Sequence, residues 1–279
     1  MARRAEALGY DALWVGEHLL YRFADGSSRG PWEAWTTMGA LAAATTTIRF
    51  GPLVACTNFH NPAMLAKQAA TLDEISGGRF VLGLGAGWNE TEFRAYGYPY
   101  DHRIDRFGEA FTIIRTLLRE GAIDFDGRWY QARDCELSPR SSTPGGPPLL
   151  IGSNGDRMLS ITLPYVNAWN SWFNSTGNRP EGVSALTSKV DAAATAAGRD
   201  PAEIERSVAV YVRLRGGRGR LQGSGETPPA PLEGEPAKMA EELWAYAAAG
   251  IDEVQLVMDP ISADSIEEFA AVLRLLDAA

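Results

Sequence analysis

The sequence has few residues of the kinds that build disulfide frameworks or metal centres. Its 279 residues include two cysteines, Cys56 and Cys135, and three histidines. Two cysteines give no disulfide framework and fit a reducing compartment, so we expect a cytoplasmic protein. The histidines and cysteines lie far apart along the chain, which gives a metal site no support.

The sequence also has fewer basic than acidic residues. Lysine and arginine number 26 against 35 aspartates and glutamates, for a net charge of −9. Nucleic-acid binding needs a basic face, so this balance argues against a nucleic-acid partner. No uninterrupted apolar run reaches the length of a membrane span, and the first residues are charged rather than leader-like. We therefore expect neither a membrane partner nor a signal peptide.

The most informative stretch is residues 77–90, Gly-Gly-Arg-Phe-Val-Leu-Gly-Leu-Gly-Ala-Gly-Trp-Asn-Glu. Its apolar run predicts a buried strand, which leads into three glycines at alternate positions. A helix should follow, with Asn89 as N-cap and Glu92 as its capping-box partner. A barrel enzyme places its chemistry at such a strand end. Alternatively, the glycines serve only close packing. Trp88 stands where a dinucleotide fingerprint needs its third glycine, which excludes that motif.

Strands and helices alternate along the whole chain. We predict strands at 11–15, 48–56, 79–84, 148–152, 165–170, 207–214 and 253–258. The fold class is therefore α/β, a single (β/α)8 TIM-type barrel over residues 1–279. Such a barrel has eight strands, and a helix is predicted from residue 2, so we expect the first β-strand to be lacking. A hairpin insertion is predicted at about 123–138, and a mobile Gly- and Pro-rich loop at about 216–236.

Two strand ends carry candidate site residues. Glu17 and His18 follow the strand at 11–15, where His18 could act as a general acid or base; the alternative is a histidine that caps local backbone. A glycine-rich turn follows the strand at 148–152, and its backbone with an adjacent arginine suits a phosphate; the alternative is a plain helix cap. That predicted phosphate loop consists of Gly152, Ser153, Asn154, Gly155 and Arg157. Trp169 ends the next strand and Arg103 lies in a charged rim segment, so both are candidate substrate contacts.

Several blocks resemble one known family. They are Leu13–His18, Asn61–Lys67, Asp73–Arg79 and Gly83–Trp88, followed by Glu92 and Phe93. In this order they resemble the bacterial luciferase-like monooxygenase superfamily, and most closely its branch of oxidoreductases that use the deazaflavin coenzyme F420.

The resemblance implies roles for particular residues. Glu17 and His18 would be catalytic, and the third strand would be bulged near Leu53–Ala55, with a non-proline cis peptide. The bulge itself, the segments after the strands predicted at 48–56 and 79–84, and the phosphate loop would bind the cofactor. These residues are Leu53, Val54, Ala55, Thr57, Asn58, Gly85, Ala86, Trp88 and Asn89. Relatives that oxidise a sugar phosphate carry an acid at the position of Ala86, so that reaction is not expected here.

The implied function is hydride transfer between F420 and a small organic substrate. One alternative is an FMN-dependent luciferase-like monooxygenase. A second is a non-catalytic flavin-binding relative, which the missing strand favours. The expected partners are a small-molecule substrate and, as the candidate assembly, a second copy of the chain in a homodimer.

Overall fold

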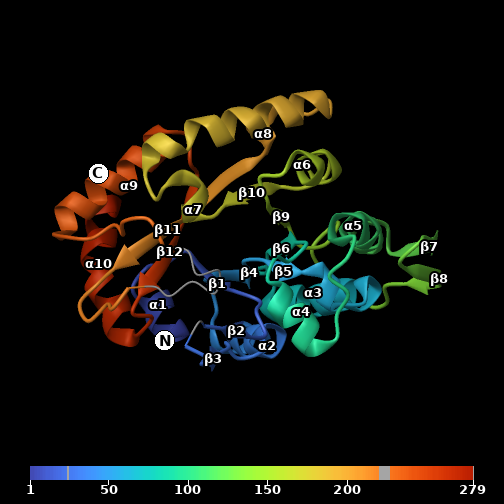
Figure 1. Ribbon diagram of the computed structural model, residues 1–279. Helices are drawn as coiled ribbons and strands as arrows, with labels where there is room; N and C mark the ends of the chain where they lie inside the picture. Colours follow the sequence, from blue (N-terminus) through green and yellow to red (C-terminus); the bar gives the residue numbers. More distant parts are fainter. Residues whose placement is uncertain (24, 220–226, 279) are drawn as a thin grey trace. The chain divides into compact units, whose positions relative to one another are not determined.

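The computed structural model describes residues 1–23, 25–219 and 227–278 (Figure 1). The chain forms two compact units. We call Ala12–Ile151 the N-terminal unit, and Met1–Asp11 with Gly152–Ala279 the C-terminal unit.

Parallel strands form the centre of the N-terminal unit. Strand β1 (Ala12–Val15) pairs with β4 (Arg49–Pro52), and β6 (Leu82–Gly85) pairs with both β5 (Ala55–Cys56) and β9 (Leu149–Gly152). Two glycines allow this backbone packing. A methyl group on Gly51 would lie 2.0 Å from the Val81 carbonyl oxygen, and one on Gly83 would lie 2.2 Å from that of Pro52. No side chain fits at either position.

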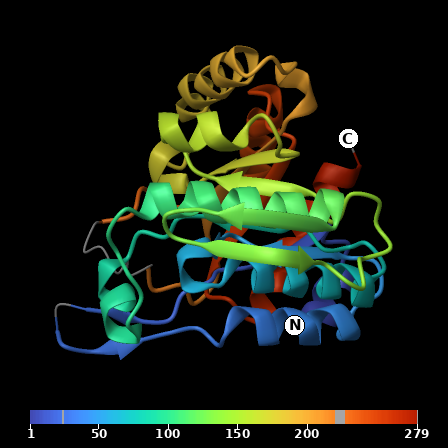
Figure 2. The same cartoon turned by 90° about the vertical axis from the view of Figure 1, so that its right-hand side faces the viewer.

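Helices cover these strands, and local capping sets their ends. Asn61 caps α3 by accepting the Met64 amide, Pro62 occupies the first helical position, and Gly77 ends the helix in the left-handed conformation. Helices α3 and α5 pack side by side (Figures 1 and 2). The helices of this unit are α2 (Ala34–Ala44), α3 (Pro62–Ser76), α4 (Glu90–Tyr96) and α5 (Arg103–Glu120).

The predicted hairpin insertion is present. Strands β7 (Ala122–Asp126) and β8 (Gln131–Glu136) pair antiparallel and lie beside α5 (Figures 1 and 2). The Glu109 carboxylate of α5 accepts the backbone amides of Arg128, Trp129 and Tyr130 at 2.8–3.0 Å. The helix therefore holds the hairpin turn directly.

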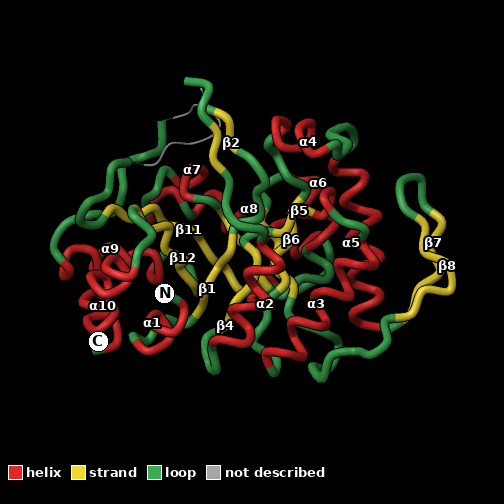
Figure 3. The backbone as a smooth tube through the Cα atoms, turned by 90° about the horizontal axis from the view of Figure 1, so that it is seen from below, coloured by secondary structure: helices red, strands yellow, loops and turns green. Residues whose placement is uncertain are grey.

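The C-terminal unit contains three parallel strands, β10 (Ala168–Ser171), β11 (Glu205–Arg213) and β12 (Glu253–Asp259). Helix α10 packs against both α1 and α9 (Figure 3), and the Tyr10 hydroxyl donates to the Ile266 carbonyl. The helices of this unit are α1 (Ala2–Ala7), α6 (Asp156–Thr162), α7 (Phe173–Thr176), α8 (Ser184–Ala196), α9 (Pro236–Ala248) and α10 (Ala263–Asp277).

The structure corrects some local expectations. Between the first two predicted strands, where no strand is predicted, β2 (Tyr21–Arg22) and β3 (Ser28–Arg29) form a short antiparallel ribbon. The strand predicted at 48–56 is two strands, because Pro52 ends β4 and two residues separate it from β5. The interruption includes a non-proline cis peptide at Leu53–Val54, where the resemblance places a bulge with such a peptide.

Two further points concern the loop and the helices. Of the loop predicted at 216–236, residues 220–226 lie outside the described part of the chain. Within the described ranges, no helix is both long and apolar enough to cross a membrane.

Candidate functional site

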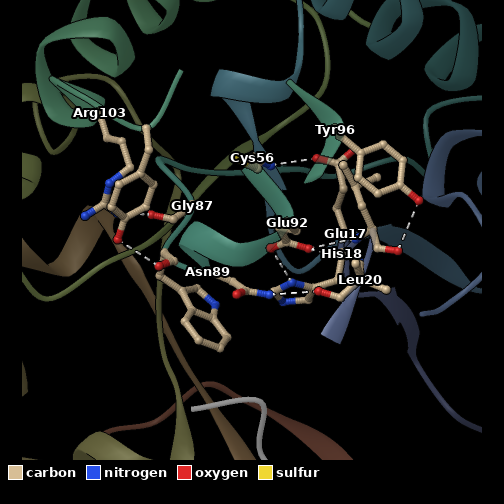
Figure 4. Close-up of polar contacts among 12 residues, drawn as sticks. Glu17, His18, Leu20, Cys56, Gly87, Asn89, Glu92, Tyr96 and Arg103 are labelled. Atoms are coloured by element: carbon tan, nitrogen blue, oxygen red, sulfur yellow. Dashed lines mark hydrogen bonds and ion pairs between the residues drawn. The ribbon is translucent and has the colours of Figure 1, made fainter. Parts of the chain in front are cut away.

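The segment after β1 places His18 against a buried carboxylate. His18 Nδ1 lies 3.0 Å from Glu92 Oε1 of α4, as Figure 4 shows. The Glu92 side chain is 2% exposed and the His18 side chain 22% exposed. The ring of His18 also packs against those of Tyr21 and Trp88, at centroid distances of 4.7 and 5.7 Å. One edge of the imidazole is therefore bound within the protein, and the ring keeps some access to solvent.

Glu92 and Asn89 do not form the predicted capping box. Asn89 does occupy the N-cap of α4, but its side chain caps no helical amide and instead donates to the Leu20 carbonyl at 2.9 Å. Glu92 Oε2 accepts the amides of Leu19 and Leu20 at 2.8 and 3.4 Å. The capping-box prediction is wrong because both side chains bind the 18–20 segment, which no local pattern reveals.

A second carboxylate, Glu17, is surrounded by donors. Its Oε1 accepts from Trp35 Nε1 and faces His60 Nε2, both at 2.8 Å, and its Oε2 accepts the Cys56 amide at 2.7 Å. Glu17 is 7% exposed. Both oxygens are thus used within the protein, and Glu17 links β1 to β5. This geometry suits a positioning group; the catalytic role stays a prediction.

Cys56 shares this environment. Its thiol is buried, and burial, reinforced by the charge of Glu17, raises the pKa of Cys56 well above its ordinary range. A thiol held neutral in this way is a poor nucleophile and acts as an apolar core group. The same sulfur explains Gly87, since a methyl group there would lie 2.5 Å from Cys56 Sγ. At Gly83 and Gly87, close packing by the protein itself accounts for the glycine.

The Trp88 loop is held at its backbone while its indole is half exposed. Arg103 donates to the Gly87 carbonyl, and the Tyr100 hydroxyl donates to the Trp88 carbonyl at 3.0 Å (Figure 4). The Arg103 guanidinium lies over the Tyr100 ring at 4.2 Å. The described contacts of Arg103 therefore support the loop, and its role toward a substrate stays a prediction.

Asn58 has one unsatisfied group in the segment predicted to meet a cofactor ring. Its Nδ2 donates to the carbonyls of Ala86 and Arg103 at 2.8 and 3.2 Å, while its buried Oδ1 has no hydrogen-bond partner. Two carbonyl partners fix the amide orientation, so the orphan atom is the oxygen. Buried acceptors without a donor are rare in folded proteins.

Neighbouring residues differ in their access to a ligand. Leu53 and Val54 are half-buried, whereas the side chains of Ala55 and Thr57 are fully buried. Thr57 Oγ1 donates to the Gly85 carbonyl at 3.3 Å. In this arrangement Ala55 and Thr57 support the segment rather than offer side-chain surface to a ligand.

The predicted phosphate loop lies in the C-terminal unit between β9 and α6. Gly155 and Arg157 are exposed, and Asn154 Nδ2 donates to Ser171 Oγ at 3.0 Å. Lys189 of α8, which the sequence does not reveal, donates from Nζ to the Asn154 carbonyl at 2.7 Å and pairs with Asp156 at 2.8 Å. Asn154 Oδ1 is a second buried acceptor without a partner.

Trp169, a predicted substrate contact, lies inside the protein. The residue is fully buried, and its indole donates to the Ser153 carbonyl at 2.9 Å. In this arrangement Trp169 supports the phosphate loop, and its role toward a substrate stays a prediction. Next to it, Asn170 Nδ2 donates to Ser207 Oγ at 3.1 Å and to Gln255 Oε1 at 2.7 Å, which joins all three strands of the unit.

The comparisons with known proteins identify the family. A model of the luciferase-like monooxygenase family matches residues 1–218. The chain belongs to the luciferase-like monooxygenase family. It is 32% identical over 277 residues to the pyrimidine monooxygenase RutA of Cronobacter sakazakii, covering 88% of this chain and 74% of that protein. It is 31% identical over 173 residues to RutA of Caulobacter segnis, covering 60% of this chain and 48% of that protein.

Solved structures of luciferase-like proteins show the same fold. An F420-dependent secondary alcohol dehydrogenase in complex with an F420-acetone adduct superposes with a TM-score of 0.83 and 21% identity, over 99% of this chain and 93% of that one. This likeness confirms the predicted α/β barrel fold class. The chain spans about half the length of most of the curated luciferase-like relatives that it matches.

The structure of this family member brings several predicted site residues together. Glu17, His18, Asn58, Trp88 and Arg103 all lie in the N-terminal unit and are joined by the contacts described above. The first four follow strands, whereas Arg103 begins α5. The phosphate loop belongs to the C-terminal unit. Three supporting residues escaped sequence reasoning, namely Trp35, His60 and Lys189. Their partners are distant in the sequence, so no local spacing marks them. In the described ranges, no group of three or more metal-binding side chains gathers.

Proposed function

We propose that this chain is an oxidoreductase that binds coenzyme F420 and transfers hydride to or from a small organic substrate. The observation that carries the proposal is His18, which follows β1 with Nδ1 against the buried Glu92 and with its ring partly accessible to solvent. A histidine with one nitrogen held and the other able to exchange a proton suits general acid–base chemistry.

The N-terminal unit offers features that fit a flavin-like ring. Both flavins and F420 carry an imide N–H, and the buried Oδ1 of Asn58 is an acceptor without a protein donor. Leu53 and Val54 beside it are half-buried, which suits apolar contact with a planar ring. These residues would hold the ring, and His18 would meet the substrate.

The phosphate loop of the C-terminal unit supports binding of the cofactor's charged tail. Gly155 and Arg157 are exposed there, so backbone amides and a guanidinium are accessible to a phosphate. Lys189 adds a second positive charge at the loop through its contact with the Asn154 carbonyl. The Lys189–Asp156 pair keeps this ammonium beside the loop.

The proposed reaction is a two-electron exchange with a hydroxyl or carbonyl group. When bound, the cofactor supplies the ring carbon that accepts or gives the hydride. As a substrate alcohol carbon gives up its hydride, His18 Nε2 would take the hydroxyl proton, and the C–O bond would become a carbonyl. In the reverse direction His18 would return that proton.

Two relatives support an alternative, since RutA proteins are pyrimidine monooxygenases. That alternative is an FMN-dependent monooxygenase.

Parallel titrations test the proposal. Protein fluorescence would be followed during addition of F420 and, separately, of FMN. Turnover would be followed by the deazaflavin absorption band with a panel of short secondary alcohols, and by oxygen uptake with reduced FMN. We expect F420 to bind more tightly than FMN, the absorption band to decrease with an alcohol, and no oxygen uptake.

The other outcomes overturn the proposal in distinct ways. Tighter binding of FMN together with oxygen uptake would establish the monooxygenase alternative. Binding of either cofactor without turnover across the panel and with reduced FMN would identify a non-catalytic flavin-binding relative. Binding of neither cofactor would reject both cofactor assignments.

A further inference from the structure

We propose that Glu92 is a positioning residue that confines proton exchange on His18 to its Nε2 atom. The inference rests on the proposed function, because it concerns the proton that His18 would exchange with a substrate. It goes further by assigning a task to a glutamate that the sequence marks only as a capping-box partner.

The hydrogen-bonding capacity of a carboxylate carries the argument. An ionised carboxylate can only accept hydrogen bonds. Glu92 Oε2 already accepts the amides of Leu19 and Leu20, and its Oε1 lies 3.0 Å from His18 Nδ1. His18 Nδ1 must therefore carry its hydrogen in both the neutral and the charged imidazole. Only Nε2 can then gain or lose a proton.

Burial and packing keep this arrangement in place. Glu92 is 1% exposed, so water does not compete for its oxygens. The rings of Tyr21 and Trp88 flank the imidazole at 4.7 and 5.7 Å and limit its tilt. The described contacts of His18 with protein groups involve Nδ1 and the ring faces, whereas Nε2 has no hydrogen-bond partner in the described ranges.

A second contact ties the same segment to α4. Asn89 Nδ2 donates to the Leu20 carbonyl at 2.9 Å, so the start of α4 holds residues 18–20 through both a donor and an acceptor (Figure 4). The position of Nε2 therefore follows the position of α4. A purely structural role would need only the contacts of Glu92 with the two amides, and would not depend on which nitrogen of His18 carries hydrogen.

The substitution Glu92→Gln separates the two roles. The amide oxygen of glutamine can keep the Leu19 and Leu20 contacts, and its NH2 group then faces His18 Nδ1. A donor at that position requires Nδ1 to be an acceptor, so the hydrogen of the neutral ring moves to Nε2. We expect the tautomer of His18 to reverse while the side-chain shape is conserved.

The primary readout is the ¹⁵N NMR spectrum of the imidazoles in the cofactor-free protein. The chain has three histidines, so a His18→Asn variant assigns the His18 signals. In the wild type we expect a protonated Nδ1 and an Nε2 that carries the lone pair in the neutral ring. In Glu92→Gln the two patterns should exchange. With F420 and a reactive alcohol, kcat should fall at least tenfold while KM changes less than twofold.

Two variants serve as controls. Glu90→Gln changes an exposed glutamate in the same turn of α4 and should leave the spectrum and kcat unchanged. Glu92→Asp keeps the carboxylate and should keep the wild-type tautomer. If Glu92→Gln does not fold, the wild-type spectrum still decides, because a neutral His18 with its hydrogen on Nε2 overturns the inference.

The remaining outcomes are distinguishable. An unchanged His18 tautomer in folded Glu92→Gln overturns the inference, and so does a reversed tautomer with unchanged kcat. A reversed tautomer in a protein that shows no turnover with F420 rejects the proposed function and supports control of the ring by Glu92.

Discussion

His18 and His60 each face a buried glutamate, at 3.0 and 2.8 Å, yet their surroundings differ. The partner of His18 uses its second oxygen on the two amides that follow His18, so both of its oxygens act on one short segment. The partner of His60, Glu17, contacts three different elements through Trp35, Cys56 and His60 itself. Both rings are partly exposed, at 22% and 17%. A histidine–glutamate pair therefore holds one short segment and its ring in the first case, and joins separate parts of the fold in the second.

Both glutamates are buried, so the other hydrogen bonds of each glutamate, rather than its burial or residue type, separate the two roles. A glutamate that holds one imidazole leaves the other nitrogen for chemistry. A glutamate with three donors from separate elements contributes to stability, because removing it leaves several buried donors unsatisfied. The predictions below test this separation, from the largest expected effect to the smallest.

The substitution His18→Ala should abolish most turnover and spare the fold. Loss of a general acid–base group lowers kcat by about 10²- to 10⁴-fold. The side chain is partly exposed, so we expect the melting temperature to stay close to that of the wild type. Steady-state kinetics with F420 and thermal unfolding would be measured on the same preparation. The control His102→Ala, at an exposed histidine, should change neither. Unfolding of His18→Ala would make His18 a structural residue instead.

The substitution Glu17→Ala should give the opposite pattern. Three donors would lose their acceptor inside the protein. Removing one partner of a buried pair such as Glu17 and His60 lowers the free energy of unfolding by about 3 to 5 kcal/mol. Urea unfolding with an unchanged slope would measure this loss. A stability within about 1 kcal/mol of the wild type, with a large loss of turnover, would mean that Glu17 is catalytic, and the contrast between the two pairs would fail.

The substitution Arg157→Ala extends the contrast to the C-terminal unit. We expect it to weaken cofactor binding and to leave kcat unchanged. Losing a charge-assisted contact costs about 1.5 to 3 kcal/mol of cofactor binding. Fluorescence titration with F420 would detect the change, and Arg133→Ala on the exposed hairpin provides the control. If the affinity of Arg157→Ala matches that of the control, Arg157 does not bind the phosphate.

The buried Cys56 should give the smallest effect, visible only at alkaline pH. Burial raises the pKa of Cys56 in the folded protein above that of the unfolded chain. The contribution of the Cys56 thiol to the free energy of unfolding is therefore fully present below the unfolded pKa of about 8.5. It decreases as pH rises, by up to about 1.4 kcal/mol per pH unit. Comparison of wild type with Cys56→Ala in urea between pH 8 and 9.5 would isolate it. Equal slopes in the two proteins would contradict the assignment.

Much of the fold follows from local sequence patterns. The strands β1, β6, β9 and β12 coincide with short apolar runs, and Asn61–Pro62 and Gly77 mark both ends of α3. The ribbon at β2 and β3 was missed because its strands have two residues each, too few for a periodic pattern. The cis peptide at Leu53–Val54 was expected only through resemblance to a family, since neither residue carries a local signal.

The sequence identifies candidate site residues, but it does not predict which residues contact them. His18 at a strand end and the glycines near Trp88 are visible in the sequence. Glu92, 74 residues from His18, and His60, 43 residues from Glu17, become partners only through the fold. The burial of Trp169 was not predictable either, because a large aromatic residue at a strand end can line a site or fill the core.

The most direct test of the contrast between the two histidines is one ¹⁵N imidazole spectrum of the wild-type protein without cofactor. Both partners are acceptors, and they face different nitrogens of their rings. In the neutral rings, we predict that hydrogen resides on Nδ1 of His18 and on Nε2 of His60, so the two residues show opposite tautomers. If His18 carries its hydrogen on Nε2, Glu92 does not orient His18 for proton exchange. If both residues carry hydrogen on Nδ1, the contrast with His60 fails.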